Sequence, residues 1–217
     1  MKCHTMSTSI MDRERMLDRI DSVRKTVKGK LPNIYLLHGE VTDDEMNLLY
    51  NHPKIKALVS LPKGEGFGRP FLEFSLCNKP IIASSWSGQT DFLNKDFVRF
   101  VKGDLTAVHK SATVKNLILA ESQWFTADSA DVGKAYKDVY KNYKKWVVNG
   151  KRQGRYSRTN FSYEAMVDKL KSILDSNIPE FPKQMELTLP KLNLPQLQKA
   201  EGAKELPKLK LPQLKKL

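Results

Sequence analysis

A glycine-rich segment that begins and ends near a glutamate holds the residue types best suited to chemistry. Glu65 and Glu73 are separated by seven residues, and Gly64, Gly66 and Gly68 lie within or beside that interval. Glycines let backbone N–H groups approach a ligand closely. Two carboxylates at this spacing can accept hydrogen bonds from two sets of sugar hydroxyls. The segment therefore predicts a site for a ligand that carries hydroxyl groups and an anion such as diphosphate.

The elements on either side would place this segment at a ligand-binding edge. An apolar run at 55–59 predicts a buried strand, and Pro70 predicts a short helix over 70–76. A loop between a parallel strand and a helix lies at the carboxyl end of the sheet, where doubly wound folds bind ligands. The start of that helix would also offer unpaired N–H groups to an anion.

Similar strand and helix patterns alternate along the rest of the first 110 residues. Thr42 to Glu45 form a capping box, and Ser87 is expected to cap the helix after it. This alternation predicts an α/β fold with a doubly wound, Rossmann-like parallel sheet. Further strands are expected at 34–37, 80–83 and 97–101, and helices at 12–28 (capped by Gly29), from 42 to 49 and at 88–93.

Beyond residue 111 the pattern is less regular. Residues 114–119 fit a strand or a helix, and a long helix is expected from Asp128 or Ser129 to Gly150. A basic loop should follow, and Ser162 should cap a last helix. The long helix is expected to pack one apolar face into the core, formed by Val132, Tyr136, Val139, Tyr140, Tyr143, Trp146 and Val147.

From Pro182 onward the composition changes. A pattern of Leu, Pro, Lys and Gln at 189–199 returns at 206–216. Prolines at this interval forbid a continuous helix, so we expect a domain over 10–178 and an extended tail over 179–217. The tail is either a flexible basic segment or a strand that docks on a partner or a sheet edge.

The net charge of +13 comes from two local regions. Residues 134–158 hold nine bases and one acid, and residues 181–217 hold eight lysines and three glutamates. Because the aromatic residues of the basic helix are assigned to the core, nucleic-acid binding is not expected. A peripheral contact of the lysines with an anionic membrane or an acidic partner is the alternative.

Composition also bounds the location of the chain. Cys3 and Cys77 are the only cysteines, and they lack the spacing of a disulfide framework or a zinc site. No apolar run is long enough for a membrane span, and the first residues do not resemble a secretory signal. We therefore expect a cytoplasmic protein.

The segment at 65–73 resembles the donor-binding half of retaining GT-B glycosyltransferases, the large family 4 (group 1) set. The signature is Glu-Gly-Phe-Gly-x-Pro-x-x-Glu, and it matches from Glu65 to Glu73. The resemblance covers about residues 10 to 175. Supporting matches are His38-Gly39-Glu40-Val41, the run at 80–83 that leads to Ser87-Gly88, and Trp124 to Asp128 before the long helix. The repeat tail lies outside it and is similar to tails of bacteriophage-encoded members, which would place the protein in the host cytoplasm.

The resemblance implies the C-terminal half of a GT-B fold that transfers a sugar, with retention, from a nucleotide-sugar. Glu65 would be the catalytic residue beside the transferred sugar, and Glu73 would bind the ribose diol. No cofactor is implied, and the lack of Asp-x-Asp agrees with a metal-independent enzyme. The implied donor-binding residues are Gly64, Gly66, Phe67, Gly68, Glu73, Ser87, Gly88 and Gln89, with His38 and Gly39 near the base or ribose.

Departures from the family pattern limit the activity that this chain is expected to have. The acceptor domain and the first βαβ unit of the donor domain, with its phosphate-binding Arg and Lys, are not found in the sequence. Transfer to an acceptor (a glycan, a lipid or a protein) would then need a missing N-terminal domain or a partner chain. The alternative is a non-catalytic nucleotide-sugar-binding or structural module that docks in a larger assembly through its basic tail.

Overall fold

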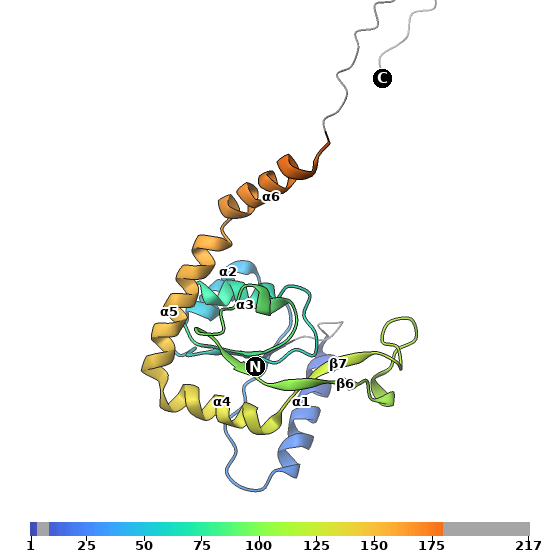
Figure 1. Ribbon diagram of the computed structural model, residues 1–217. Coiled ribbons are helices and arrows are strands. Elements are labelled where there is room, and N and C mark those ends of the chain that lie inside the picture. The colour runs from blue at the N-terminus through green and yellow to red at the C-terminus, as the bar shows by residue number, and fades with distance from the viewer. Residues whose placement is uncertain (4–8, 180–217) are drawn as a thin grey trace, which may run out of the picture. The chain divides into compact units, whose positions relative to one another are not determined.

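A small parallel sheet forms the centre of the computed structural model, which describes residues 1–3 and 9–179 (Figure 1). Its strands are β3 (Leu58–Ser60), β4 (Ile81–Ser84) and β5 (Arg99–Val101), in the order β3-β4-β5. Leu58 pairs with Ile81, and Ile82 pairs with Arg99. The predicted α/β class with a parallel sheet is confirmed, and the sheet is compatible with a Rossmann-like fold.

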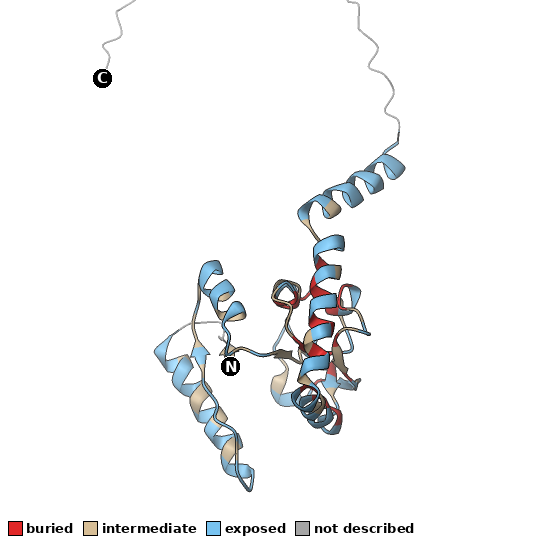
Figure 2. Cartoon of the chain, turned by 90° about the vertical axis from the view of Figure 1, so that its left-hand side faces the viewer, coloured by how far each residue is buried: buried red, intermediate tan, exposed pale blue. Residues whose placement is uncertain are grey.

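The central strand β4 is buried on both faces, as a doubly wound arrangement requires. Ile81 and Ala83 pack with Phe71 and Phe74 of α3 (Arg69–Ser75). The other face carries Ile82, whose cluster includes buried residues of α4 (Ser129–Lys141) and α5 (Tyr143–Asn160). Buried residues gather on the sheet and on the adjoining side of α5 (Figure 2). Alternate residues of one strand thus hold two helical layers in place.

The N-terminal elements include a second, two-stranded sheet and two helices. β1 (Lys2–Cys3) pairs in parallel with β2 (Leu37–His38), so the strand predicted at 34–37 is shorter and lies later. α1 (Ile10–Thr26) ends at a cap on Val27 rather than at Gly29. α2 (Asp43–Asn51) begins with the predicted capping box, in which the N–H of Thr42 donates to Glu45 Oε2 at 2.8 Å. Neither helix has a buried residue.

An antiparallel hairpin that the sequence analysis did not predict follows the sheet. β6 (Gly103–Ala107) pairs with β7 (Gln123–Ala127) along their whole length. The connection contains a 3₁₀ turn, η2 (Lys110–Ala112), and one isolated bridge between Val114 and Ile118. Residues 114–119 therefore form neither the regular strand nor the helix that was expected there.

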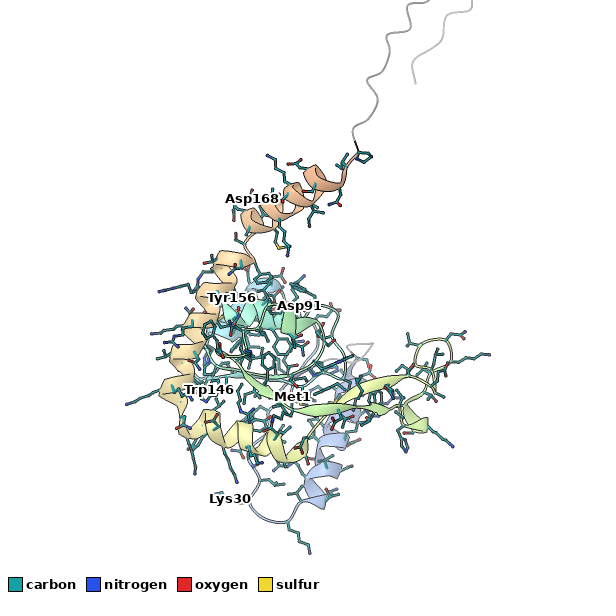
Figure 3. All side chains as sticks on the ribbon, in the orientation of Figure 1. Met1, Lys30, Asp91, Trp146, Tyr156 and Asp168 are labelled. Carbon is teal, nitrogen blue, oxygen red and sulfur yellow. The ribbon has the colours of Figure 1, made fainter. Side chains whose placement is uncertain are left out.

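The predicted long helix is two helices, because α4 ends at Lys141 and α5 begins at Tyr143. Helix α5 continues through Gly150, where the helix was expected to end, and through the residues expected to form a basic loop. Gly150 is a packing residue, since a Cβ there would lie 2.7 Å from the carbonyl carbon of Lys79. Trp146 lies in the first half of α5 (Figure 3) and is buried.

Two tyrosines of α4 that were expected in the core are exposed. Tyr136 is 50% exposed and Tyr140 is 86% exposed, so the prediction that they belong to the core is wrong. Within α4 the face turned towards the core is the one that carries Asp131, Ala135 and Val139, so both tyrosines lie outside it. Helix α4 buries Ala135 and Val139 instead.

A chain of buried polar side chains joins α3 to α5. Ser75 Oγ lies 2.8 Å from Ser157 Oγ, which also accepts from Gln153 Nε2 at 3.1 Å. The same nitrogen donates to the carbonyl oxygen of Phe92 at 2.9 Å, and Gln153 Oε1 accepts from the N–H of Asn94 at 2.9 Å. Every member is satisfied within the protein, so the chain can be buried without an unpaired polar group.

The last helix, α6 (Tyr163–Asn177), begins as predicted. Ser162 Oγ accepts from the N–H of Ala165 at 3.2 Å and so caps the helix. Within residues 9–179, no helix has both the length and the apolar content needed to cross a bilayer. The predicted repeat tail, apart from its first residue, lies outside the described residues.

Candidate functional site

The loops that follow β3 and β4 are held together at the carboxyl ends of these two neighbouring strands. The N–H of Glu65 donates to Ser87 Oγ at 2.9 Å, and Ser87 Oγ donates to the carbonyl oxygen of Glu65 at 2.6 Å. The N–H of Gly88 donates to the same carbonyl oxygen at 2.9 Å. Two predicted site segments that are far apart in the sequence are thereby brought into direct contact.

The contact leaves no room for a side chain at Gly88. A Cβ built there would overlap the carbonyl group of Gly66, so the two backbones pass each other too closely for any other residue. Ser87 has a φ of 85°, in a region that side chains rarely adopt, and its two hydrogen bonds to Glu65 hold it there. The loops therefore form a clamp with a defined geometry.

Ser87 does not cap an α-helix, as was expected. Its hydroxyl is used by Glu65, and the segment after it is a 3₁₀ helix, η1 (Gly88–Asp91), instead of the helix predicted at 88–93. A short 3₁₀ turn follows directly because the clamp fixes the backbone of Gly88 against Glu65.

Gln89 is completely buried beneath the clamp. Its Nε2 donates to the carbonyl oxygens of Ser84 at 3.1 Å and Trp86 at 2.7 Å, which fixes the turn after β4. Its Oε1 is buried and has no hydrogen-bond partner among the described residues. An unpaired buried acceptor is costly, so this oxygen marks a place where a further donor would be stabilising.

The start of α3 places a carboxylate beside backbone donors. Gly68, at φ +92°, is the residue before the helix, and its N–H donates to Glu65 Oε1 at 3.2 Å. The N–H groups of Gly66 and Phe67 make no hydrogen bond to any described residue. These two donors and the half-buried Glu65 are therefore available at one loop. The exposed Phe67 ring lies 5.0 Å from the ring of Phe92.

Glu73 lies one turn into α3, on the wall of a cavity. Arg69 Nε donates to Glu73 Oε1 at 2.6 Å, and Arg69 Nη2 lies 4.0 Å from Asp43 Oδ1 of α2. The hydrogen bond to Glu73 raises the pKa of Arg69 above its ordinary value. The cavity between α2 and α3 has a volume of about 710 Å³ and is lined by Asp43, Met46, Asn47, Tyr50, Asn51, Arg69, Pro70, Glu73, Leu76 and Cys77.

Tyr50 and Cys77 are neutral members of this cavity wall. Burial raises the pKa of the Tyr50 hydroxyl, and the nearby Glu73 raises it further. Burial also raises the pKa of the Cys77 thiol, so this cysteine is not an activated nucleophile. The charge of the cavity at neutral pH therefore comes from Asp43, Arg69 and Glu73.

His38 and Gly39 have their contacts elsewhere. His38 pairs with Cys3 in the β1–β2 sheet, and Lys2 Nζ donates to the carbonyl oxygen of Gly39 at 2.6 Å. His38 Nε2 is buried without a partner among the described residues. The hydrogen bonds of these two residues thus join them to the N-terminus and not to the clamp. Gly64 does lie at the clamp, where a Cβ would be 3.7 Å from the Trp86 ring.

Several aromatic residues that the sequence analysis did not assign to the site support the loop. The N–H of Phe125 in β7 donates to the carbonyl oxygen of Lys63 at 2.8 Å. The Phe125 ring is parallel to that of Trp86, with centroids 6.3 Å apart, and Lys63 Nζ lies 4.3 Å from the centre of the Trp124 ring. Trp86 could have been recognised as a candidate site residue, because it is a large aromatic residue in a segment rich in Ser and Gly.

Neither a metal group nor a relative identifies the site. Among the described residues, no three His, Cys, Asp or Glu side chains gather where they could hold a metal ion. The chain matches no protein-family model, and a search of curated proteins finds no match.

Proposed function

We propose that this chain binds a nucleotide-sugar and forms the donor-binding half of a retaining glycosyltransferase. The observation that carries the proposal is the clamp in which Ser87 and Gly88 bind the backbone of Glu65. It joins the two segments that the family resemblance implicates, at the edge where parallel α/β sheets bind ligands. Transfer to an acceptor would require an N-terminal domain or a partner chain.

In this proposal the clamp binds the sugar and diphosphate. The N–H groups of Gly66 and Phe67 follow Glu65 in the same loop, have no partner among the described residues, and can donate to phosphate or sugar oxygens. Backbone donors need no metal ion to bind an anion, in keeping with the expected metal-independent chemistry. Glu65 would accept hydrogen bonds from the transferred sugar and stabilise the positive charge that develops on it.

The nucleoside would bind beside Glu73. The cavity next to this carboxylate, at about 710 Å³, lies within the range of roughly 300–1,000 Å³ that small-molecule sites occupy. Arg69 holds the Glu73 carboxylate through one oxygen and leaves the other for a ribose hydroxyl. Tyr50 adds an apolar wall with a neutral hydroxyl.

A non-catalytic binding module is the second candidate function, and one contact favours it. Glu65 Oε1 accepts from the N–H of Gly68, so this carboxylate helps to fix the conformation of its own loop. If the role of the Glu65 carboxylate is to maintain this loop, the chain would bind a nucleotide-sugar without transferring the sugar.

Isothermal titration calorimetry against UDP-, GDP- and ADP-linked sugars tests the proposal on the full chain. We expect saturable binding of at least one nucleotide-sugar. Absence of binding to every member of the panel, with intact folding by circular dichroism, would overturn it. Release of nucleoside diphosphate in the presence of an acceptor fraction then separates the enzyme from the binding module.

Substitutions in the clamp and the cavity sharpen this test. Gly88→Ala should abolish binding, because the added Cβ overlaps Gly66 and separates the two loops. Glu73→Ala should weaken nucleotide binding about tenfold, as expected for a lost charged hydrogen bond. Glu65→Ala should reduce transfer more than affinity. Glu121→Ala, at an exposed acid remote in sequence, is the matched control and should change neither.

A further inference from the structure

The exposed face of α4 carries two rows of side chains that the donor site does not use. Tyr136 and Tyr140 are one turn apart, and both are exposed. Lys134, Lys137 and Lys141 form a neighbouring row at helical spacing, and all three are exposed. We call these five residues the tyrosine–lysine face.

The acidic residues of α4 lie away from this face. Asp131 accepts from Arg99 Nη2 at 2.8 Å and from the N–H of Lys102 at 2.9 Å. Asp138 Oδ2 lies 3.8 Å from Arg99 Nε. Both carboxylates are therefore directed towards β5. Among the described residues, no acidic side chain forms an ion pair with a lysine of the face.

The chemistry of the face selects among anionic partners. A helix that lies in a membrane interface needs an apolar face of large side chains, but α4 turns Ala135 and Val139 into the protein core. Tyrosine rings beside lysines instead match single-stranded nucleic acid, in which exposed bases stack on aromatic rings while lysines contact phosphates. Nucleic acid is not expected if the aromatic residues of 134–158 lie in the core; Trp146 does, but Tyr136 and Tyr140 are exposed.

We propose that the tyrosine–lysine face of α4 binds single-stranded nucleic acid without sequence preference. Tyr136 and Tyr140 would each stack with a base, and Lys134, Lys137 and Lys141 would contact the phosphates alongside. Cβ atoms one turn apart are separated by about 5–6 Å, which allows two successive bases to reach the two rings. This surface acts independently of the clamp, so it does not depend on the proposed glycosyltransferase function.

Fluorescence anisotropy with the full chain separates base stacking from charge. The probes are a labelled oligothymidylate of about 16 nucleotides and an abasic strand of the same length and charge. We expect tighter binding of oligothymidylate than of the abasic strand. Tyr136→Ala combined with Tyr140→Ala should weaken oligothymidylate binding at least about thirtyfold and remove the difference between the probes. Equal binding of the two probes by the unmodified chain would overturn the proposal.

The matched controls lie on α6. Tyr163 is 80% exposed on that helix, so Tyr163→Ala removes an equally accessible ring outside the face. Lys137→Glu combined with Lys141→Glu should weaken oligothymidylate binding and reduce its salt dependence. Lys169→Glu combined with Lys171→Glu, on α6, should have a much smaller effect on both. Equal effects of the α4 and α6 variants would show non-specific attraction. If the α4 variants lost binding to phosphatidylserine vesicles but kept oligothymidylate binding, the face would be assigned to membranes. Either of these two results would contradict the proposal.

Discussion

Residues 9–54 and residues 55–161 contain helices with similar patterns but differ in what those helices bury. α1 and α2 have no buried residue, although α1 has apolar residues at helical spacing. In the second region β4 is buried throughout, and α3 contributes two fully buried phenylalanines. The difference teaches that a helical pattern and good caps produce a helix, whereas burial requires a surface for the helix to pack against.

The apolar surface left on the N-terminal region is substantial. Val23 is 65% exposed, and Ile10, Met11, Val27 and Tyr35 are also exposed. In the described part of the chain, these side chains belong to neither of the two core clusters. α2 reaches the core through the partly buried Tyr50, whereas none of these α1 side chains does, and the stability of the sheet region depends on its core.

The largest expected difference between the regions comes from truncating a core aromatic. Phe74 is 1% exposed, and its ring makes an edge contact with Tyr50 at 5.3 Å between centroids. Phe74→Ala should lower the free energy of unfolding by about 3–5 kcal/mol, because it removes buried apolar surface and leaves a cavity. Chemical denaturation followed by tryptophan fluorescence measures this loss. A loss below about 1 kcal/mol would mean that the sheet region is not the main source of stability.

A smaller effect is expected from the charged contact between α4 and β5. Hydrogen bonds from Arg99 and from the Lys102 N–H lower the pKa of Asp131 below its ordinary value of 3.8. Asp131→Asn should therefore cost about 1–3 kcal/mol at neutral pH. Since the folded state has the lower pKa, this contribution is present above pH 3.8 and is lost as the pH falls below it.

The stability of Asp131→Asn should accordingly approach that of the unmodified chain in acid. Denaturation midpoints across the acidic range measure the convergence. Asp128→Asn is the matched control, because that side chain caps α4 from an exposed position and an asparagine can do the same. A difference that is constant with pH would contradict the assignment to the Asp131 carboxylate.

A third prediction concerns the capping box of α2. Thr42→Ala removes the acceptor for the N–H of Glu45 and should cost about 1 kcal/mol. Because α2 reaches the core through Tyr50, close to its other end, the loss should be confined largely to the first turn of the helix. Hydrogen exchange should show faster exchange of the α2 amides with little change in β4. Equal acceleration in both elements would mean that the two regions unfold together.

The smallest effect is expected from an apolar residue of α1. Val23→Ala should change the free energy of unfolding by less than about 0.5 kcal/mol, because the side chain is largely exposed and alanine favours the helix. The same denaturation experiment as for Phe74→Ala applies. A cost of several kcal/mol would reveal a contact for α1 that the described residues do not contain.

Local signals in the sequence predicted the main parts of the sheet region. The strands near 55–59, 80–83 and 97–101 exist, although β3 begins later because residues 52–55 form a turn. The capping box at Thr42 and the cap at Ser162 were predicted because their side-chain oxygens can accept from backbone N–H groups of the first helical turn, as they do in the structure. These features depend on residues close together in the sequence, which is why a pattern can reveal them.

Features that depend on distant residues were not predictable in this way. The β6–β7 hairpin has a long connection without the tight turn that marks most hairpins, and β6 is largely exposed, so its alternation is weak. Gly150 was interpreted as a helix end, but it is required by the approach of Lys79. At the candidate site, the glycines and Glu65 were predicted from spacing. The use of Ser87 to bind Glu65, rather than to cap a helix, depends on the pairing of β3 with β4.

The polar chain through Ser75, Ser157 and Gln153 gives α5 a single permitted register. Leucine-rich helices can slide by a turn and still find apolar neighbours, but Gln153 must meet both the Phe92 carbonyl and the Asn94 N–H. A displaced α5 would leave several buried donors and acceptors unpaired at once. Misaligned intermediates are thereby penalised during folding. Docking of α5 should then be all-or-none, and variants of these polar residues should produce heterogeneous packing before they produce unfolding.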